Sequence, residues 1–209
     1  MKRLLLIAAG LAILSTLGGV GFLEPSHVHA QGFIDFEDGV DGEPIQSSIP
    51  GLQFTTTEGY DWIYGDWRTG RYNGPYPDGA YYSNGNFFAW LGPNQGAGRI
   101  DLTQSCATYL QVWVSSAYGL TANAYRSNGT LAATASVEGN LATGRLVPLR
   151  VEVPPHDCFS YVILHDTGNQ WMIDDLTTDA PGSPPSRHHP PWAHGQPPEQ
   201  LRRLSRQYR

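Results

Sequence analysis

Acidic residues gather at two places that lie far apart in the chain, Asp35 to Glu37 and Asp174-Asp175. If Phe36 points into a core from a strand, Asp35 and Glu37 point together to the opposite side. A regular strand lets only one of Asp174 and Asp175 face that side. Carboxylates that meet across neighbouring first and last strands suit Ca²⁺. We therefore expect a structural calcium site at these four acids. The alternative is four solvated side chains.

Residues 60–90 hold eleven of the 24 aromatic side chains, interleaved with Gly, Pro, Asn and Asp. Much of this stretch, from 65 to 86, has the composition of a loop. Sugar rings stack their C–H faces on Trp and Tyr, and their hydroxyls bind carboxylates and Arg. The alternative is a long loop folded onto the domain by its own aromatic side chains. The first interpretation predicts a carbohydrate-binding platform of Trp62, Tyr64, Trp67 and Tyr72, with Asp66 and Arg68 orienting the ligand.

Catalytic motifs are absent from the sequence. It has no G-x-S-x-G elbow, no H-E-x-x-H, no E-x-D-x-x-E acid pattern and no glycine-rich phosphate loop. His156 and His165 each precede an aspartate, but without a nucleophile such neighbours are more typical of surface polar residues. We expect a binding protein rather than an enzyme, while a catalytic site assembled only by the fold stays open.

The two cysteines, Cys106 and Cys158, are separated by 52 residues. In an exported, oxidising setting they are expected to form one disulfide, which stabilises the fold by about 4 kcal/mol in the chain-entropy model. The alternative is two buried thiols.

The N-terminus has the features of an export signal. Lys2 and Arg3 precede an uncharged apolar run from 4 to about 23, and Val28-His29-Ala30 offers small residues at a cleavage site. We expect residues 1–30 to be a signal peptide cut after Ala30, and a secreted protein, extracellular or periplasmic. An uncleaved membrane anchor is the alternative. No transmembrane segment is expected after cleavage.

Composition changes abruptly at residue 180. Residues 31–179 hold 17 acidic side chains and six arginines, a net charge of −11, whereas the Pro/Arg-rich residues 180–209 carry +4. The acidic balance argues against nucleic-acid binding by the folded part. The tail is expected to be disordered, since it lacks apolar residues for a core. It is either a solvated end or a basic arm for anionic surfaces.

Short alternating or β-branched runs, separated by turn pairs such as Asn84-Gly85 and Asn128-Gly129, fill residues 31–179. They predict an all-β sandwich of about eight or nine antiparallel strands. The expected strands are Phe33–Glu37, Leu52–Thr57, Phe87–Leu91, Tyr109–Ser115, Thr121–Arg126, Leu131–Glu138, Arg145–Val153, Phe159–His165 and Trp171–Thr177.

The opening D-F-E-D-G at residues 35–39, the closing I-D-D-L at 173–176 and the stretch 119–129 carry a family resemblance. With the short strands between them, they resemble secreted galactose-binding-like jelly rolls, which include many carbohydrate-binding modules, and MAM adhesion domains. MAM domains usually have more cysteines, so the general jelly roll fits better. The resemblance implies a jelly-roll β-sandwich and calcium near Asp35, Glu37 and Asp174 or Asp175.

The expected function is therefore non-catalytic binding of carbohydrate or polysaccharide by a secreted domain with one Ca²⁺ and one disulfide. A surface adhesion or structural protein whose aromatic loop contacts protein is a second possibility. A polysaccharide hydrolase or lyase is a third.

Overall fold

The computed structural model describes residues 32–58, 61–72, 81–92, 96–166 and 168–182. The predicted signal peptide and nearly all of the predicted tail lie outside these residues, as does the middle of the aromatic stretch, 73–80. Within the described part of the chain, no helix is long and apolar enough to cross a membrane.

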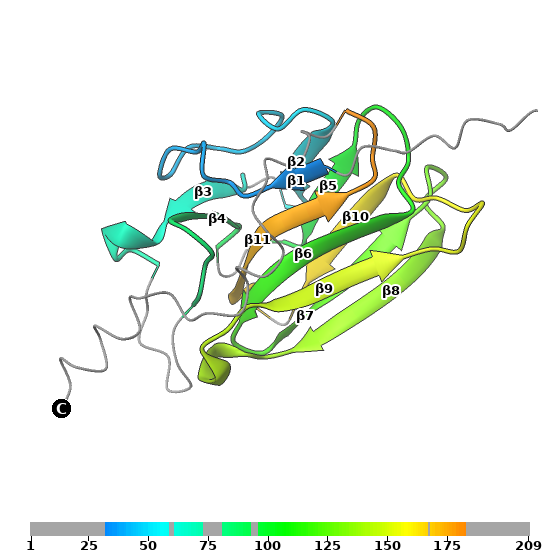
Figure 1. The fold of residues 1–209 in the computed structure, drawn as a ribbon. Coiled ribbons are helices and arrows are strands. Elements are labelled where there is room, and N and C mark those ends of the chain that lie inside the picture. The colour runs from blue at the N-terminus through cyan, green and yellow to red at the C-terminus, as the bar shows by residue number, and fades with distance from the viewer. Residues whose placement is uncertain (1–31, 59–60, 73–80, 93–95, 167, 183–209) are drawn as a thin grey trace, which may run out of the picture.

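Two antiparallel sheets form the molecule (Figure 1). Sheet A contains β1 (Gly32–Ile34), β3 (Ile63–Asp66), β4 (Phe87–Trp90), β6 (Tyr109–Ser116), β9 (Val147–Glu152) and β11 (Trp171–Thr178). Sheet B contains β2 (Leu52–Thr56), β5 (Gly98–Leu102), β7 (Gly119–Tyr125), β8 (Leu131–Glu138) and β10 (Tyr161–His165). Two short 3₁₀ turns, η1 (Trp67–Thr69) and η2 (Leu141–Thr143), complete the regular structure of the described residues.

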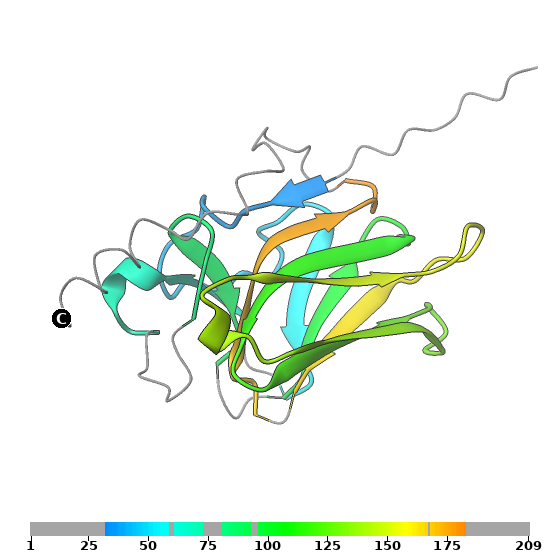
Figure 2. The same cartoon turned by 60° about the horizontal axis from the view of Figure 1, so that its bottom comes forward.

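The strand order is that of a jelly roll. Sheet A runs β3-β4-β11-β6-β9, with β1 also paired to β11, and sheet B runs β2-β5-β10-β7-β8. The eight strands from β4 to β11 therefore form two four-stranded layers that pack face to face. One layer has the order β4-β11-β6-β9 and the other the order β5-β10-β7-β8. This is the two-sheet arrangement of two Greek keys. Figure 2 shows β6, β9 and β11 on one side of the molecule and β7, β8 and β10 on the other.

The expected β-sandwich is confirmed, and each of the nine expected strands overlaps an observed one. The structure adds two strands, β3 and β5. β5 was not predicted because the strand is short and two of its five residues, Arg99 and Asp101, are charged. Its three inward residues, Gly98, Ile100 and Leu102, form too short an apolar pattern to be recognised. β3 lies inside the aromatic stretch that was interpreted as a ligand platform. The first strand ends early, since Phe36 has a left-handed φ of 58°.

Alternation along the strands builds the core between the sheets. On β6, Leu110, Val112 and Val114 are buried, while the residues between them face outward. The largest buried side chains are those of Trp62 and Trp171. Their rings meet edge to face in the core, with centroids 5.4 Å apart. The Trp62 indole N–H donates to the Thr55 carbonyl at 2.7 Å, so its polar atom is satisfied.

Gly98 allows this packing, because a Cβ built there would lie 2.2 Å from Cζ2 of Trp62. We expect Gly98→Ala to lower the free energy of unfolding by about 1–3 kcal/mol, since the core has no room for the extra methyl group. Gly168→Ala is the matched control, because its nearest neighbour lies 3.9 Å away. Urea unfolding of both variants is the measurement. Equal stability of the two would contradict this packing.

Candidate functional site

Trp62, the first residue of the predicted sugar platform, lies in the core. Trp62 is fully buried, with the Phe54 ring on one side at 5.5 Å and Trp171 on another. It offers no ring face to a ligand, so this part of the prediction is wrong. The sequence does not distinguish Trp62 from the aromatic residues around it, so its inward position just before β3 was not predicted.

Asp41 organises much of the remaining platform. Its carboxylate accepts from the Asp66 backbone at 3.0 Å, the Tyr72 hydroxyl at 2.9 Å and the Arg71 guanidinium at 3.0 Å. Tyr72 is buried against Phe88 and Trp90, and burial together with Asp41 raises the pKa of its phenol to about 12. Tyr72 therefore packs the fold and does not present its ring to solvent.

Asp66 and Arg68 pair with each other. The Asp66 side chain accepts from the Arg68 backbone N–H at 2.9 Å and caps η1, while the Arg68 guanidinium makes a two-point ion pair with the same carboxylate. The Arg68 hydrogen bond holds the pKa of Asp66 below its usual value. The Arg68 side chain stays half exposed and reaches over the Phe87 ring.

The last two platform residues hold loops in place. The Tyr64 hydroxyl is hydrogen-bonded to Ser48 at 2.8 Å, and its ring packs edge to face on Phe36. The Trp67 indole N–H donates to the Gly85 carbonyl at 3.1 Å, and its ring is half-buried. The six predicted residues are therefore divided: Trp62 lies in the core between the sheets, whereas Tyr72 and Trp67 belong to a separate apolar cluster.

Residues 81–86, which we call the crossing segment, lie across the outer face of sheet A. At one end the Tyr82 N–H donates to the Ser115 hydroxyl at 3.0 Å and the Tyr82 hydroxyl donates to the Leu141 carbonyl. In the middle, Asn84 donates to two acids: its backbone N–H to Asp174 at 2.7 Å, and its side-chain amide to Asp175 at 2.9 Å.

The far end of the crossing segment is held by Glu37. One carboxylate oxygen accepts from the backbone N–H groups of Asn86 at 2.6 Å and Phe87 at 2.8 Å. Asp35 lies beside it and accepts from the Glu37 N–H at 3.2 Å. Glu37 and Asp174, which lie near opposite ends of the domain sequence, thus accept from backbone N–H groups of the same segment, at Asn86 and Asn84.

A β-bulge changes how Asp174 and Asp175 are arranged. The register of β11 against β6 shifts between Asp174 and Thr177, and Asp175 has a left-handed φ of 45°. Both carboxylates consequently reach Asn84 and both are fully buried. The expectation that only one could face this side is wrong, because it assumed a regular strand.

The electrostatics of this acid cluster suit a cation. Burial, followed by the charges of Asp175 and Glu37, raises the pKa of Asp174 well above its ordinary range. Hard carboxylate and amide oxygens are the donors that Ca²⁺ prefers. In the described residues, however, no three His, Cys, Asp or Glu side chains stand close enough together to hold a metal ion. The donor chemistry of Asp174, Asp175 and Glu37 therefore fits calcium.

A cleft of about 610 Å³ opens at another place, at one end of the sandwich. Three connections line it: the β5–β6 loop, the β7–β8 turn and the β9–β10 loop. Half of the lining residues carry hydroxyls or amides, and the others are one ion pair, one histidine, one leucine and the two cysteines of the disulfide. The residues that matter for the argument are Gln104, Ser105, Arg126, Ser127, Asn128 and His156.

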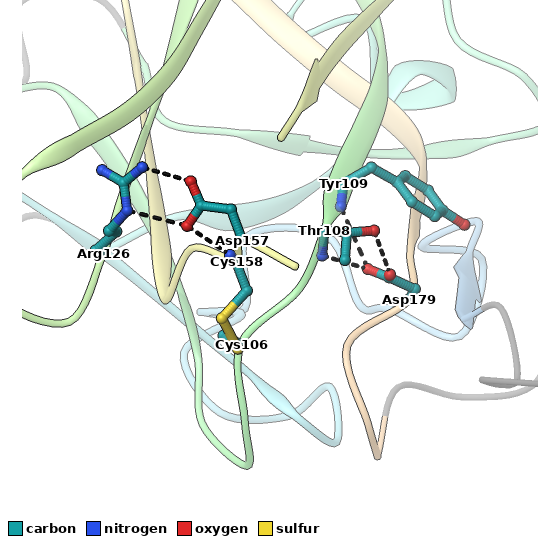
Figure 3. Close-up of a disulfide and its surroundings, with 7 residues drawn as sticks. All are labelled: Cys106, Thr108, Tyr109, Arg126, Asp157, Cys158 and Asp179. Atoms are coloured by element: carbon teal, nitrogen blue, oxygen red, sulfur yellow. Dashed lines mark hydrogen bonds and ion pairs between the residues drawn. A yellow bond between two sulfur atoms is a disulfide. The ribbon is translucent and has the colours of Figure 1, made fainter. Parts of the chain in front are cut away.

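A disulfide and a β-bridge fix two of these connections to each other. Cys106 and Cys158 are bonded, which confirms the predicted disulfide, and Ala107 pairs with Phe159 through two hydrogen bonds of 3.0 Å. Next to this, Asp179 accepts from the backbone N–H and hydroxyl of Thr108, at 2.9 and 2.6 Å, and so ties the start of β6 to the end of β11 (Figure 3).

The third connection is held by an ion pair. Arg126 binds Asp157 with two guanidinium nitrogens, and Asp157 also accepts from the Cys158 N–H at 2.8 Å (Figure 3). The Arg126 hydrogen bond holds the pKa of Asp157 below its usual value. The charges of this pair cancel within the cleft wall, so the cleft is polar but carries no net charge from Arg126 and Asp157.

His156 is held in a strained conformation at the rim of the cleft. The Asp157 N–H donates to the Pro154 carbonyl at 3.1 Å and closes a β-turn in which Pro155 and His156 are the central residues. His156 has a φ of 81°, which at this position of a type II turn normally selects glycine. A side chain in such a conformation costs about 1–3 kcal/mol, and such residues cluster at functional sites.

Aromatic side chains border the cleft on the outer face of sheet B. Tyr125 and Tyr161 stack with ring centroids 5.1 Å apart, and the Arg99 guanidinium lies 3.9 Å from the Tyr161 ring centroid. Leu131, paired with Tyr125 across β7 and β8, is exposed at the same end. The cleft therefore has an amphipathic border.

The sequence contained partial signals for this cleft. Asn128-Gly129 predicted the β7–β8 turn, and the cysteine pair joined the other two connections. What it lacked was the strand order, which alone brings these three connections to the same end of the sandwich. His156 was correctly placed at the surface but given no function, because its φ is not visible in the sequence.

The fold and these features define a disulfide-linked jelly-roll β-sandwich. The chain matches no protein-family model, and no curated protein is significantly similar to it. Among solved structures, the K2 cleaved adhesin domain of Lys-gingipain is similar to this chain, with 12% sequence identity and a TM-score of 0.46. The match covers 71% of this chain and 99% of that domain. A similarity of this size carries no argument about function.

The strain at His156 gives a test that compares two substitutions. Glycine normally destabilises a protein by about 0.5–1 kcal/mol relative to alanine. At a left-handed position we expect the reverse, with His156→Gly about 1 kcal/mol more stable than His156→Ala. Thermal and urea unfolding of the two variants measure the difference. An alanine variant as stable as the glycine variant would show that this turn is unstrained.

Proposed function

We propose that this protein is a secreted, non-catalytic carbohydrate-binding protein that binds its ligand in the cleft beside the disulfide. The observation that carries the proposal is the cleft of about 610 Å³, in which half of the lining residues carry uncharged hydroxyl or amide side chains. Sugar hydroxyls both donate and accept hydrogen bonds. Ser105, Ser127 and the amides of Gln104 and Asn128 do the same.

The charge distribution favours an uncharged saccharide over an anionic one. Arg126 is the arginine of the cleft wall, and its guanidinium is neutralised by Asp157. A carboxylate or sulfate ligand would compete with Asp157 for this cation. The exposed Leu131 and the half-buried Tyr125 supply an apolar border suited to the C–H faces of a sugar.

A panel of insoluble polysaccharides and soluble oligosaccharides tests the proposal with the full chain, by pull-down and calorimetry. The double variant Ser105→Ala/Ser127→Ala removes two neutral hydrogen bonds worth about 1 kcal/mol each, and it should weaken binding at least tenfold. His156→Gly should also weaken binding while keeping the fold. Gln111→Ala, on sheet A, is the control and should bind normally.

The other outcomes point to other functions. Binding to a protein surface that free sugar does not displace supports an adhesion protein. New reducing ends or unsaturated products from a polysaccharide support a hydrolase or lyase. No binding to any saccharide by a folded protein contradicts the proposal.

We further propose that Asp174, Asp175 and Glu37 take up Ca²⁺, with Asp35 next to them. The support is the full burial of two adjacent aspartates and the raised pKa of Asp174, since a divalent cation would offset their repulsion. Binding at a hundredfold excess over Kd adds about 2.7 kcal/mol to the free energy of unfolding.

Calorimetry with calcium and with EDTA measures this effect. The wild-type melting temperature should rise by several degrees with calcium and return with EDTA. Asp174→Asn should remove the response, while Glu138→Gln, an exposed acid on β8, should keep it. A melting temperature of the wild type that calcium does not change would rule out this site.

A further inference from the structure

Asparagine followed by glycine is a chemically reactive pair, because glycine has no side chain to keep its backbone nitrogen away from the preceding side-chain amide. The chain contains three such pairs, Asn73-Gly74, Asn84-Gly85 and Asn128-Gly129. The first lies outside the described residues. The other two have the same reactive groups but very different surroundings in the fold, so the structure decides how each of them behaves.

The reaction of such a pair needs only hydroxide and water. The glycine nitrogen loses its proton to hydroxide and attacks Cγ of the asparagine, and a carbon–nitrogen bond forms. The side-chain nitrogen takes a proton from water and leaves as ammonia. Water then opens the resulting succinimide ring at either carbonyl and gives aspartate or isoaspartate. The rate depends on how close the reacting atoms lie and how well the developing negative charge is stabilised.

Asn128 lies in the β7–β8 turn with its side chain folded back along the chain. Its Oδ1 accepts from the Thr130 N–H at 3.0 Å and from the Thr130 hydroxyl at 2.7 Å. The first bond closes an Asx turn, which brings Cγ back toward the Gly129 nitrogen. Both bonds draw electron density from the side-chain carbonyl. They therefore make Cγ more electrophilic and stabilise the oxyanion that forms when the nitrogen attacks.

Gly129 has to break one hydrogen bond before it reacts. Its N–H donates to the Arg126 carbonyl at 2.9 Å and closes the turn. Residues 127–130 are all exposed, so water replaces this bond when the turn opens, and the cost of opening is small. The succinimide ring also has room, since the nearest atom to a Cβ built at Gly129 is the Tyr161 hydroxyl at 4.0 Å.

Asn84 is held where the same reaction is opposed. Its side-chain amide, the leaving group, donates to Asp175 at 2.9 Å, and its backbone N–H donates to Asp174 at 2.7 Å. Gly85 lies against Glu37, because a Cβ built there would collide with the Glu37 carboxylate. An anion at the Gly85 nitrogen would form beside these three acids, and conversion of Asn84 would add a fourth. Like charges disfavour both steps.

We propose that Asn128 is a site of spontaneous conversion to aspartate and isoaspartate in the folded protein, whereas Asn84 is protected by the acids that bind it. The fold thus selects one of two chemically equivalent pairs. The product places a new negative charge on the wall of the cleft, which Asn128 and Arg126 both line. Isoaspartate also adds a methylene group to the backbone of the β7–β8 turn.

The consequence for ligand binding rests on the proposed function. Asn128 supplies one of the two amides of the cleft wall, beside Gln104. Its conversion replaces a hydrogen-bond donor with a charge, so the converted protein should bind an uncharged saccharide more weakly. The conversion itself is measured without any ligand. A protein that binds no saccharide would contradict the proposed function and leave the modification site standing.

Peptide mapping of the full chain by mass spectrometry measures both pairs in one sample. The folded protein is incubated at mildly alkaline pH with its disulfide intact and is then digested with trypsin. Fragmentation is needed, because the peptide 72–99 contains both Asn73 and Asn84. Asn128 should convert at least about tenfold faster than Asn84, which corresponds to about 1.4 kcal/mol in activation free energy.

The unfolded chain is the matched control. In urea, with the disulfide reduced, Asn128 and Asn84 should convert at similar rates, since the fold no longer distinguishes them. Equal rates of the two in the folded protein would overturn the proposal. An Asn128 that stays intact in the folded protein, under alkaline conditions that convert it in urea, would overturn it as well.

Two variants of Thr130 test the contribution of its hydroxyl. Thr130→Val removes the hydrogen bond to Asn128 and keeps the shape of the side chain, so conversion of Asn128 should slow. Thr130→Ser keeps a hydroxyl and should convert like the wild type. Melting curves check that both variants fold. A valine variant that converts as fast as the serine variant would contradict the activation of Cγ by this bond.

Discussion

The arrangement of the aromatic stretch depends on one interaction, the pair of hydrogen bonds that Asn84 donates to Asp174 and Asp175. Two fully buried carboxylates on β11 accept hydrogen bonds from the backbone and the side chain of a single residue of the crossing segment. Because Glu37 holds the next residues in the same way, the segment is drawn across the outer face of sheet A. This face is then closed by Phe88, Met172 and Tyr72, which would otherwise lie open to solvent.

That interaction needs a departure from regular strand geometry. A regular β11 would turn one aspartate toward the core, where no charge is tolerated. The bulge at Asp175 instead turns both acids outward, at the cost of a left-handed backbone conformation in a residue other than glycine. The two features lie apart: the buried acids hold the crossing segment on the outer face of sheet A, and the disulfide lies beside the polar cleft at one end of the sandwich.

Periodicity was enough to predict the sandwich, since nine strands show alternating or β-branched runs with turn pairs between them. The disulfide followed from the cysteine count together with the predicted export signal. The sequence singled out the acids near both ends of the domain, but not their contacts with the crossing segment, because the bulge and the Asn84 hydrogen bonds depend on tertiary packing. Trp62 shows the main difficulty. Composition cannot tell a tryptophan that packs on Trp171 from one that faces a ligand, since both occur among Gly, Asp and Tyr.

The disulfide has a further consequence through its place in the chain order. Strands β6, β7, β8 and β9 all lie between Cys106 and Cys158, and two of them belong to each sheet. The exposed β7–β8 turn, Ser127 to Thr130, lies inside the same covalent loop. A protease that cuts this turn leaves both pieces joined through sulfur and each still paired within its sheet. A molecule nicked at this turn therefore remains a single covalent particle.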